Sequence, residues 1–238
     1  MIGISQYLLD NPYVTTLLIC HFLSDFQFQN QDMADKKTYQ KVYLIKHIIR
    51  VALPLVLLGL YKPATAPILI IIITSHGIID WFKQDIANLI MLDKKFSFVL
   101  DQVMHLLIIL IAALVFKEGQ DMGKWLNPLL LNMILFFVII TKPANVAFKI
   151  FFDKYQPLGE NKMDTIAGAG ATIGLLERII MGACMIMSQF TSIGLVFTAK
   201  SIARYNKISE SPSFAEYYLI GSLYSILSVF VTWMLLFN

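Results

Sequence analysis

Apolar runs of about twenty residues alternate with short polar linkers along almost the whole chain. A helix of about twenty apolar residues crosses the ~30 Å hydrocarbon core of a bilayer. The pattern therefore predicts eight membrane-spanning helices, and Pro143 is expected to kink or end the fifth. The expected ranges are 14–28, 42–61, 65–82, 98–116, 126–152, 166–188, 190–205 and 214–237.

The composition supports this interpretation. The chain is 57% hydrophobic and 15% charged, whereas soluble domains carry about 25% charged residues. We expect an all-α, polytopic membrane bundle. Residues 1–120 would form a four-helix half built from two tandem helical hairpins, and residues 121–238 a second four-helix half, both within one integrated membrane domain.

Lysine and arginine gather in the linkers that follow the first, third, fifth and seventh expected spans. Cytoplasmic loops are enriched in these residues, so this side is predicted to face the cytoplasm and both termini the opposite side. Because topology accounts for the basic loops and they carry no aromatic platform, we expect no nucleic-acid partner.

The candidate chemistry lies in a four-residue spacing of His and Asp that occurs three times in apolar stretches: His21-Phe-Leu-Ser-Asp25, His76-Gly-Ile-Ile-Asp80 and Asp101-Gln-Val-Met-His105. Residues four apart share one face of a helix. With His47, at the start of the second span, these pairs include all four histidines of the chain. Because successive spans alternate in direction, all of them should meet near the cytoplasmic leaflet.

The first pair and His47 are repeated by the second pair and His105, as in two related hairpins. Imidazole and carboxylate together suit Zn²⁺, Mn²⁺ or Fe²⁺ better than Ca²⁺. We predict one or two divalent metal ions, with Asp101 and His47 as catalytic groups or outer ligands. The predicted metal ligands are His21, Asp25, His76, Asp80 and His105. A proton or cation pathway is the main alternative, and structural hydrogen bonding is the simplest one.

The second half of the chain has no His/Asp pairs but carries lysine and arginine residues within or beside its expected spans. The predicted substrate-binding residues are Lys142, Arg178, Lys200 and Arg204. Taken singly, three of these would extend to the membrane surface, whereas Arg178 beside Glu177 needs a partner inside the bundle. Lys200 and Arg204 are two cations one turn apart, and Glu216 is a candidate partner for this pair. Together the cations suggest a basic wall that binds an anion.

A metal beside cations fits hydrolysis of a phosphate-bearing amphiphile, because the metal activates water and the cations stabilise developing charge. We therefore predict a metal-dependent hydrolase that acts on a membrane lipid or another amphiphilic anion. The alternatives are a transporter or channel for a metal ion, a proton or a small anion, and a membrane partner subunit. A homo-oligomer remains open.

At these residues the chain resembles a bacterial integral-membrane family known as domain of unknown function 3307. The resemblance rests on His21-Phe-Leu-Ser-Asp25-Phe-Gln-Phe-Gln29, Lys46-His47, Ser75-His76-Gly-Ile-Ile-Asp80 and Asp101-Gln-Val-Met-His105, and it covers about the first half. It implies a location in the bacterial cytoplasmic (inner) membrane and no particular activity.

Overall fold

The computed structural model describes residues 3–115, 126–157 and 168–238, and every regular element in these ranges is helical. The chain divides into two compact units, residues 1–135 and 136–238. The boundary lies inside one helix, α7 (Pro128–Ile140).

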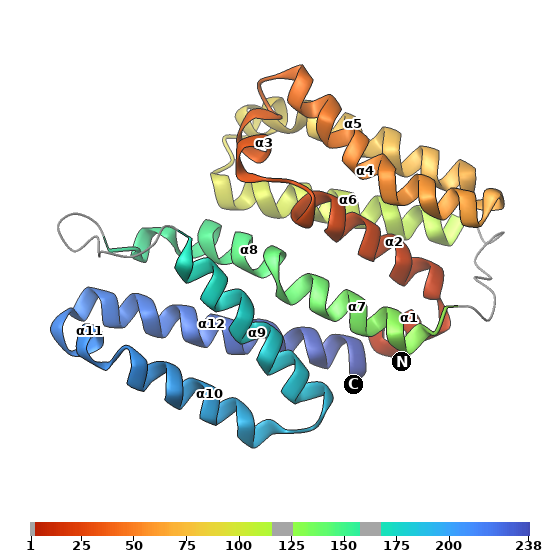
Figure 1. Cartoon of the computed structure of the whole chain (residues 1–238). Coiled ribbons are helices and arrows are strands. Elements are labelled where there is room, and N and C mark those ends of the chain that lie inside the picture. Colours follow the sequence, from red (N-terminus) through yellow and green to blue (C-terminus); the bar gives the residue numbers. More distant parts are fainter. Residues whose placement is uncertain (1–2, 116–125, 158–167) are drawn as a thin grey trace. The chain divides into compact units, whose positions relative to one another are not determined.

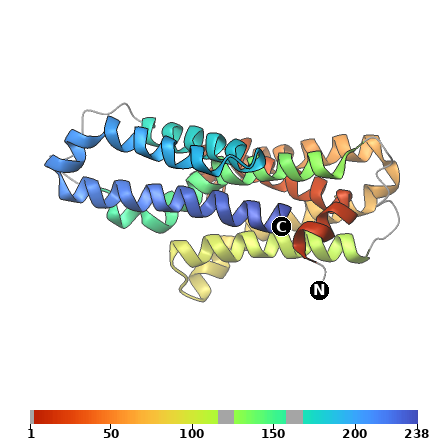
Figure 2. The same ribbon diagram turned by 90° about the horizontal axis from the view of Figure 1, so that it is seen from below.

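Four helices form the body of the first unit: α2 (Pro12–Phe22), α4 (Lys41–Tyr61), α5 (Ala66–Leu89) and α6 (Lys94–Val115). They lie alongside one another and alternate in direction (Figures 1 and 2). Helix α5 packs against α4 and α6, and α2 also packs against both. The four helices therefore enclose a common interior.

Two short helices complete this unit. Helix α1 (Ile4–Asp10) packs against α2, and α3 (Gln31–Lys36) packs against α4. The Asn30 side chain caps α3 by accepting a hydrogen bond from the Met33 backbone N–H at 2.9 Å. Residues 28–40, which contain α3, cross the end of the bundle where α2 ends (Figure 1). We call this segment the strap.

The end of α2 departs from α-helical geometry. Residues Leu23–Gln27 form a π-helical turn, in which the Phe28 N–H donates to the Leu23 carbonyl at 2.8 Å. Single π-turns inside helices are frequent at functional sites. This turn carries Asp25.

The second unit contains the end of α7 and α8 (Lys142–Phe152), α9 (Ala169–Ile186), α10 (Phe190–Ala203), α11 (Tyr205–Glu210) and α12 (Pro212–Phe237). Helix α9 packs against α8, α10 and α12. At Gly182 an added Cβ would lie 2.9 Å from Ile140 and Phe136 side-chain atoms, so a larger residue here would have to displace these side chains of α7.

The expected effect of Pro143 is confirmed. Helix α7 ends at Ile140 and α8 begins at Lys142, with the non-helical Thr141 (φ −88°, ψ −109°) between them. Proline is accommodated at the second position of the new helix, where its missing N–H leaves no helical hydrogen bond unmade.

Six helical stretches among the described residues are long and apolar enough to cross a membrane: Lys41–Tyr61, Pro63–Leu89, Lys94–Val115, Pro128–Tyr155, Ala169–Ile186 and Pro212–Phe237. The expected count of eight is not confirmed. Helix α2 and its π-turn are short, and α10 has 14 residues.

Apolar and polar residues are distributed as in a membrane protein. Leu57 and Leu60 on α4 and Leu114 on α6 are more than half exposed. By contrast, His, Asp, Glu and Arg side chains lie buried inside the units. Because charged groups are costly in hydrocarbon and apolar surface is not, this arrangement fits a bilayer better than water. The protein is a multi-pass helical membrane protein.

Candidate metal centre

All seven His and Asp residues singled out from the sequence come together inside the first unit. Helices α2, α4, α5 and α6 each contribute at least one, and the exposed fractions run from 0% to 6%. They come from the end of α2 and the π-turn after it, from the first turns of α4, and from the interior of α5 and α6. The predicted convergence of the four histidines is confirmed.

These residues form three overlapping groups, in each of which one ligand atom per residue lies within 4.8 Å of the others. Triad 1 is His21, Asp25 and His76; triad 2 is His47, His76 and Asp80; triad 3 is Asp80, Asp101 and His105. Three side chains with imidazole and carboxylate ligands are a usual protein share of a transition-metal site. Triads 1 and 3 have no residue in common.

Triads 1 and 2 are connected through His76. Its Nε2 lies 3.2 Å from Asp25 Oδ1, 3.5 Å from Asp80 Oδ2 and 3.1 Å from the Nε2 of His47. Two imidazole nitrogens at this separation share either one proton or, when a metal is bound, one ion. His76 also stacks on His105, with ring centroids 3.9 Å apart.

Triad 3 contains buried polar atoms that make no hydrogen bond within the described part of the chain and could bind a metal ion. Asp101 Oδ1 and His105 Nε2 lie 3.6 Å apart, are buried, and have no hydrogen-bond partner among the described residues. In triad 1, Asp25 Oδ1 is also buried and makes no hydrogen bond to any residue that the structure describes, and its nearest nitrogen, at 3.2 Å, is the Nε2 of its fellow candidate ligand His76. Buried polar atoms are rarely left unsatisfied, so such atoms call for an ion or a water molecule. The chemistry of the donor set fits a divalent metal ion.

Gln102 was not predicted, although it lies between Asp101 and His105 in sequence. Its Nε2 donates to Asp25 at 3.2 Å and to Asp101 at 3.3 Å, and its Oε1 lies 3.3 Å from His21 Nε2. Gln102 thus connects triad 1 to triad 3. Groups that orient metal ligands in this way commonly tune both affinity and ligand geometry.

Two lysines of the first unit also reach the cluster. The Lys37 ammonium lies 3.0 Å and 3.1 Å from the two Asp80 oxygens and 3.2 Å from His47 Nε2, with 6% of its side chain exposed. Lys83 pairs with Asp101 at 2.8 Å. In the sequence both resemble ordinary cytoplasmic-loop cations, and only their burial distinguishes them.

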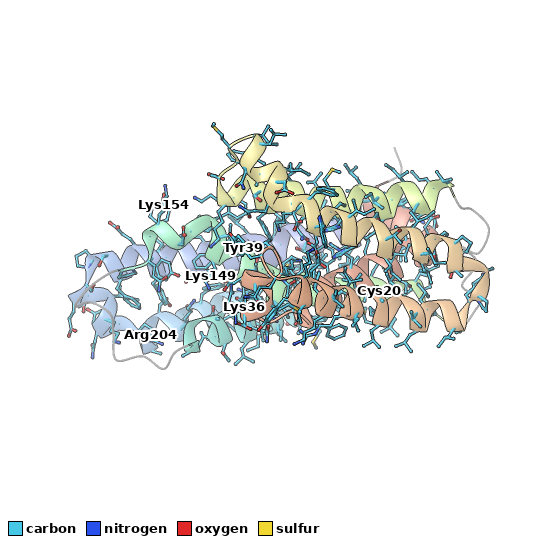
Figure 3. All side chains as sticks on the ribbon, turned by 90° about the horizontal axis from the view of Figure 1, so that it is seen from above. Cys20, Lys36, Tyr39, Lys149, Lys154 and Arg204 are labelled. Carbon is cyan, nitrogen blue, oxygen red and sulfur yellow. The ribbon has the colours of Figure 1, made fainter. Side chains whose placement is uncertain are left out.

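Lys37 is held as a charged group. Burial by itself lowers the pKa of the ammonium, but the carboxylates of Asp80, Asp25 and Asp101 outweigh burial and raise the pKa above the usual value for lysine. Its neighbour Lys36 is different, since it points outward to Asp32 at 2.6 Å with 43% of its side chain exposed (Figure 3).

The predicted substrate-binding cations all belong to the second unit. The Arg178 guanidinium donates to the Ile140 and Thr141 carbonyls and to Asn145 Oδ1. These partners flank the break between α7 and α8, so Arg178 adds a charged donor to the carbonyl groups at the point where the helix is interrupted. Its role as an anion contact stays a prediction.

Lys200 pairs with Glu177 at 2.9 Å and also donates to Ser222 at 3.1 Å, so its acidic partner is Glu177, whereas Glu216 was the candidate expected for the Lys200 and Arg204 pair. Glu177 is on α9, which packs against α10, the helix that carries Lys200. Arg204 and Lys142 are half-buried (Figure 3 labels Arg204), and their predicted roles are not tested by these contacts.

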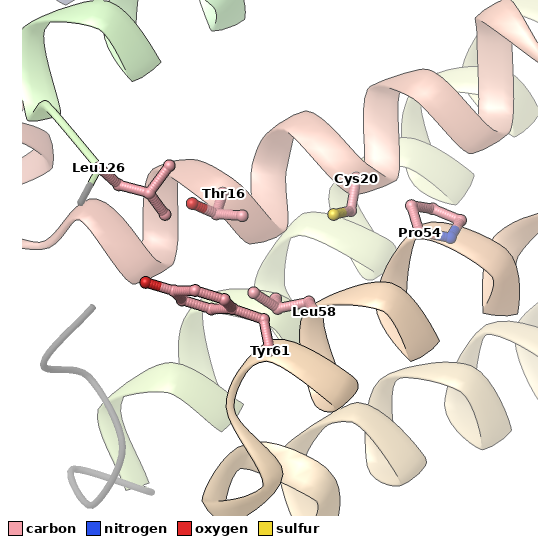
Figure 4. Close-up of a pocket in the computed structure, with 6 residues that line it drawn as sticks. All are labelled: Thr16, Cys20, Pro54, Leu58, Tyr61 and Leu126. Atoms are coloured by element: carbon pink, nitrogen blue, oxygen red, sulfur yellow. The ribbon is translucent and has the colours of Figure 1, made fainter. Parts of the chain in front are cut away.

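An apolar hollow of about 300 Å³ opens between α2 and α4. It is lined by Thr16, Cys20, Pro54, Leu58, Tyr61 and Leu126 (Figure 4). Cys20 precedes His21 in sequence but lines this hollow and belongs to none of the three triads. The thiol is therefore not part of the candidate ligand set.

Comparison with protein families agrees with these residues. The model of the family described as a protein of unknown function (DUF3307) matches residues 13–133, which is half of the chain. The chain belongs to this family. The matched segment contains all seven cluster residues as well as Lys37 and Lys83. No curated protein and no solved structure matches the chain.

Proposed function

We propose that this member of the DUF3307 family is a metal-dependent hydrolase of the bacterial cytoplasmic membrane. Its substrate would be an anionic, phosphate-bearing amphiphile near the cytoplasmic leaflet. The observation that carries the proposal is the buried cluster of three His/Asp triads with unsatisfied ligand atoms, inside a bundle of membrane-length helices.

The chemistry follows from the donor set. A bound Zn²⁺, Mn²⁺ or Fe²⁺ supplies a water of lowered pKa and polarises an ester oxygen. His21, Asp25 and His76 would hold the ion, or Asp80 and His105 with Asp101. A carboxylate that is not engaged as a ligand can take the proton of the attacking water. With the ion in triad 1, neither Asp101 nor His47 is a ligand, and these two are the proposed proton-accepting groups.

The proposal includes a membrane topology. Eight spans with both termini outside the cytoplasm place the cluster and the strap at the cytoplasmic leaflet. The two α2–α4 and α5–α6 pairs would then be the repeated hairpins. What supports this is the lysine-rich character of the linkers at the cluster end.

Hydrolysis is tested with the metal-loaded protein in detergent and a panel of phosphomonoester and phosphodiester amphiphiles. Release of phosphate or of the head group should require Zn²⁺, Mn²⁺ or Fe²⁺. It should be lost in the Asp25→Ala/Asp80→Ala double variant and retained in Asp32→Ala, which removes an exposed carboxylate. If the protein binds metal but hydrolyses no substrate of the panel, the proposed hydrolase activity is refuted.

One observation favours transport as a second candidate. His76 and His105 lie near the middle of α5 and α6, and carriers commonly bind their ions near the bilayer midplane. Reconstitution in liposomes with a metal-sensitive or pH-sensitive dye inside distinguishes the two. Cluster-dependent flux without hydrolysis would support a pathway for a metal ion or a proton.

A further inference from the structure

Lys37 contacts the same atoms that a metal ion would use. Its ammonium lies 3.0 Å and 3.1 Å from the Asp80 oxygens and 3.2 Å from His47 Nε2. Asp80 belongs to two of the three triads, and His47 to one of these two. A metal ion in triad 2 or triad 3 therefore competes with Lys37 for Asp80.

We propose that metal binding takes Asp80 from Lys37, and that the released Lys37 ammonium, together with Lys83, then binds a tetrahedral oxyanion such as phosphate beside the metal. The inference rests on the metal binding that the proposed function requires, and it names the chemical class of the ligand. It also assigns anion recognition to two lysines of the first unit, for which the sequence suggested no such role.

The net charge of the metal-loaded cluster favours the binding of an anion. Imidazoles that bind a metal ion are neutral, so in the loaded site the protein's own charge is that of the carboxylates of Asp25, Asp80 and Asp101 and the ammonium groups of Lys37 and Lys83, which sum to one negative charge. One divalent ion changes this to one positive charge. Since an uncompensated charge in a buried site is costly, the loaded site favours an added anion.

The strap keeps Lys37 close when it loses its partner. Met33 is 3% exposed, and Arg50 of α4 donates to the Phe28 carbonyl and to Met33 Sδ at 3.5 Å. These two Arg50 contacts attach the start and the middle of the strap to α4, and the Asn30 cap holds α3 together within the strap. The ammonium can therefore turn within the site but cannot leave for solvent without moving the strap. A lysine confined beside a metal is a ready contact for a phosphate oxygen.

The test is calorimetric titration of inorganic phosphate into detergent-purified protein that has been loaded with Mn²⁺ or Zn²⁺ and freed of excess metal. The variants are Lys37→Met and, as a matched control, Lys36→Met, which changes the exposed neighbour. We expect phosphate to bind the loaded wild type and not the metal-free protein. Binding should weaken at least ~10-fold in Lys37→Met and stay within ~2-fold in Lys36→Met.

Metal affinity gives a second readout that loss of structure would not imitate. Because Lys37→Met removes the competing cation, this variant should bind the metal more tightly than the wild type. If Lys37→Met does not fold, Lys83→Met carries the test, because Lys83 has 21% of its side chain exposed and tolerates replacement more easily. It too should weaken phosphate binding.

The outcomes separate the two proposals. Phosphate affinity that is equal in the wild type, Lys37→Met and Lys83→Met overturns the inference, while the metal content leaves the proposed function in place. Absence of any bound metal in the wild type overturns the proposed function, and the inference falls with it. Phosphate binding without metal also overturns the inference, since Lys37 would then not need to be released.

Discussion

The buried pair of Lys37 and Asp80 gives the sharpest prediction about stability. Their side chains are 6% and 0% exposed, so water does not screen the interaction. Replacing one partner leaves the other as a buried charge, which typically costs about 3–5 kcal/mol. We therefore expect Asp80→Asn to lower the free energy of unfolding of the metal-free protein by about that amount.

A double-mutant cycle isolates this pair. Lys37→Met alone should also destabilise, but the Lys37→Met/Asp80→Asn double variant should lose much less than the sum, because it leaves no stranded charge. We expect a coupling energy of about 2–3 kcal/mol. The assay is unfolding in detergent by added SDS, with helical circular dichroism as the signal and a chelator present.

The control cycle uses Lys36 and Asp32, which lie 2.6 Å apart on the exposed side of the strap. Exposed ion pairs contribute little, so this cycle should show no measurable coupling. If the Lys37 and Asp80 substitutions are additive, as in the control, then the ammonium is not held in the cluster and the reasoning fails.

Three further predictions concern the metal and the second unit. A chelator should lower the thermal midpoint of metal-loaded wild type but not that of Asp25→Ala/Asp80→Ala, since a ligand bound only by the folded state stabilises it; equal shifts in both would contradict the site. Arg178→Met should destabilise by about 2–3 kcal/mol in SDS titration, because three acceptors at the helix break lose their charged donor; an unchanged midpoint would refute that capping role. Gly182→Val should destabilise by about 1–3 kcal/mol through overpacking, whereas Gly194→Ala, with no atom within 4 Å of the new Cβ, should not; comparable effects at both positions would argue against the close approach of α9 to α7.

The convergence of the cluster could be predicted because it follows from two simple rules. His and Asp four residues apart share a helix face, and successive membrane helices alternate in direction. His47 followed from its place at the start of α4. The break at Thr141 was equally predictable, since Pro143 cannot continue a helix that began far upstream.

Other features have no comparable signal in the sequence. Lys37 is one of several lysines in a linker, and only the path of the strap shows that it turns inward. The π-turn at Leu23–Gln27 has no distinctive composition. Hydropathy alone did not give the number of spans, because α2 is apolar but shorter than a membrane span, and many of its side chains are buried within the first unit. The partner of Lys200 depended on helix packing, which favoured Glu177.

The central claim is that the His/Asp cluster binds a divalent transition metal, and elemental analysis of detergent-purified protein tests it most directly. The wild type should contain one or two equivalents of Zn, Mn or Fe after incubation with these metals. The Asp25→Ala/Asp80→Ala variant should contain none, and Asp32→Ala should match the wild type. A wild type without metal, or a double variant that retains it, would contradict the account.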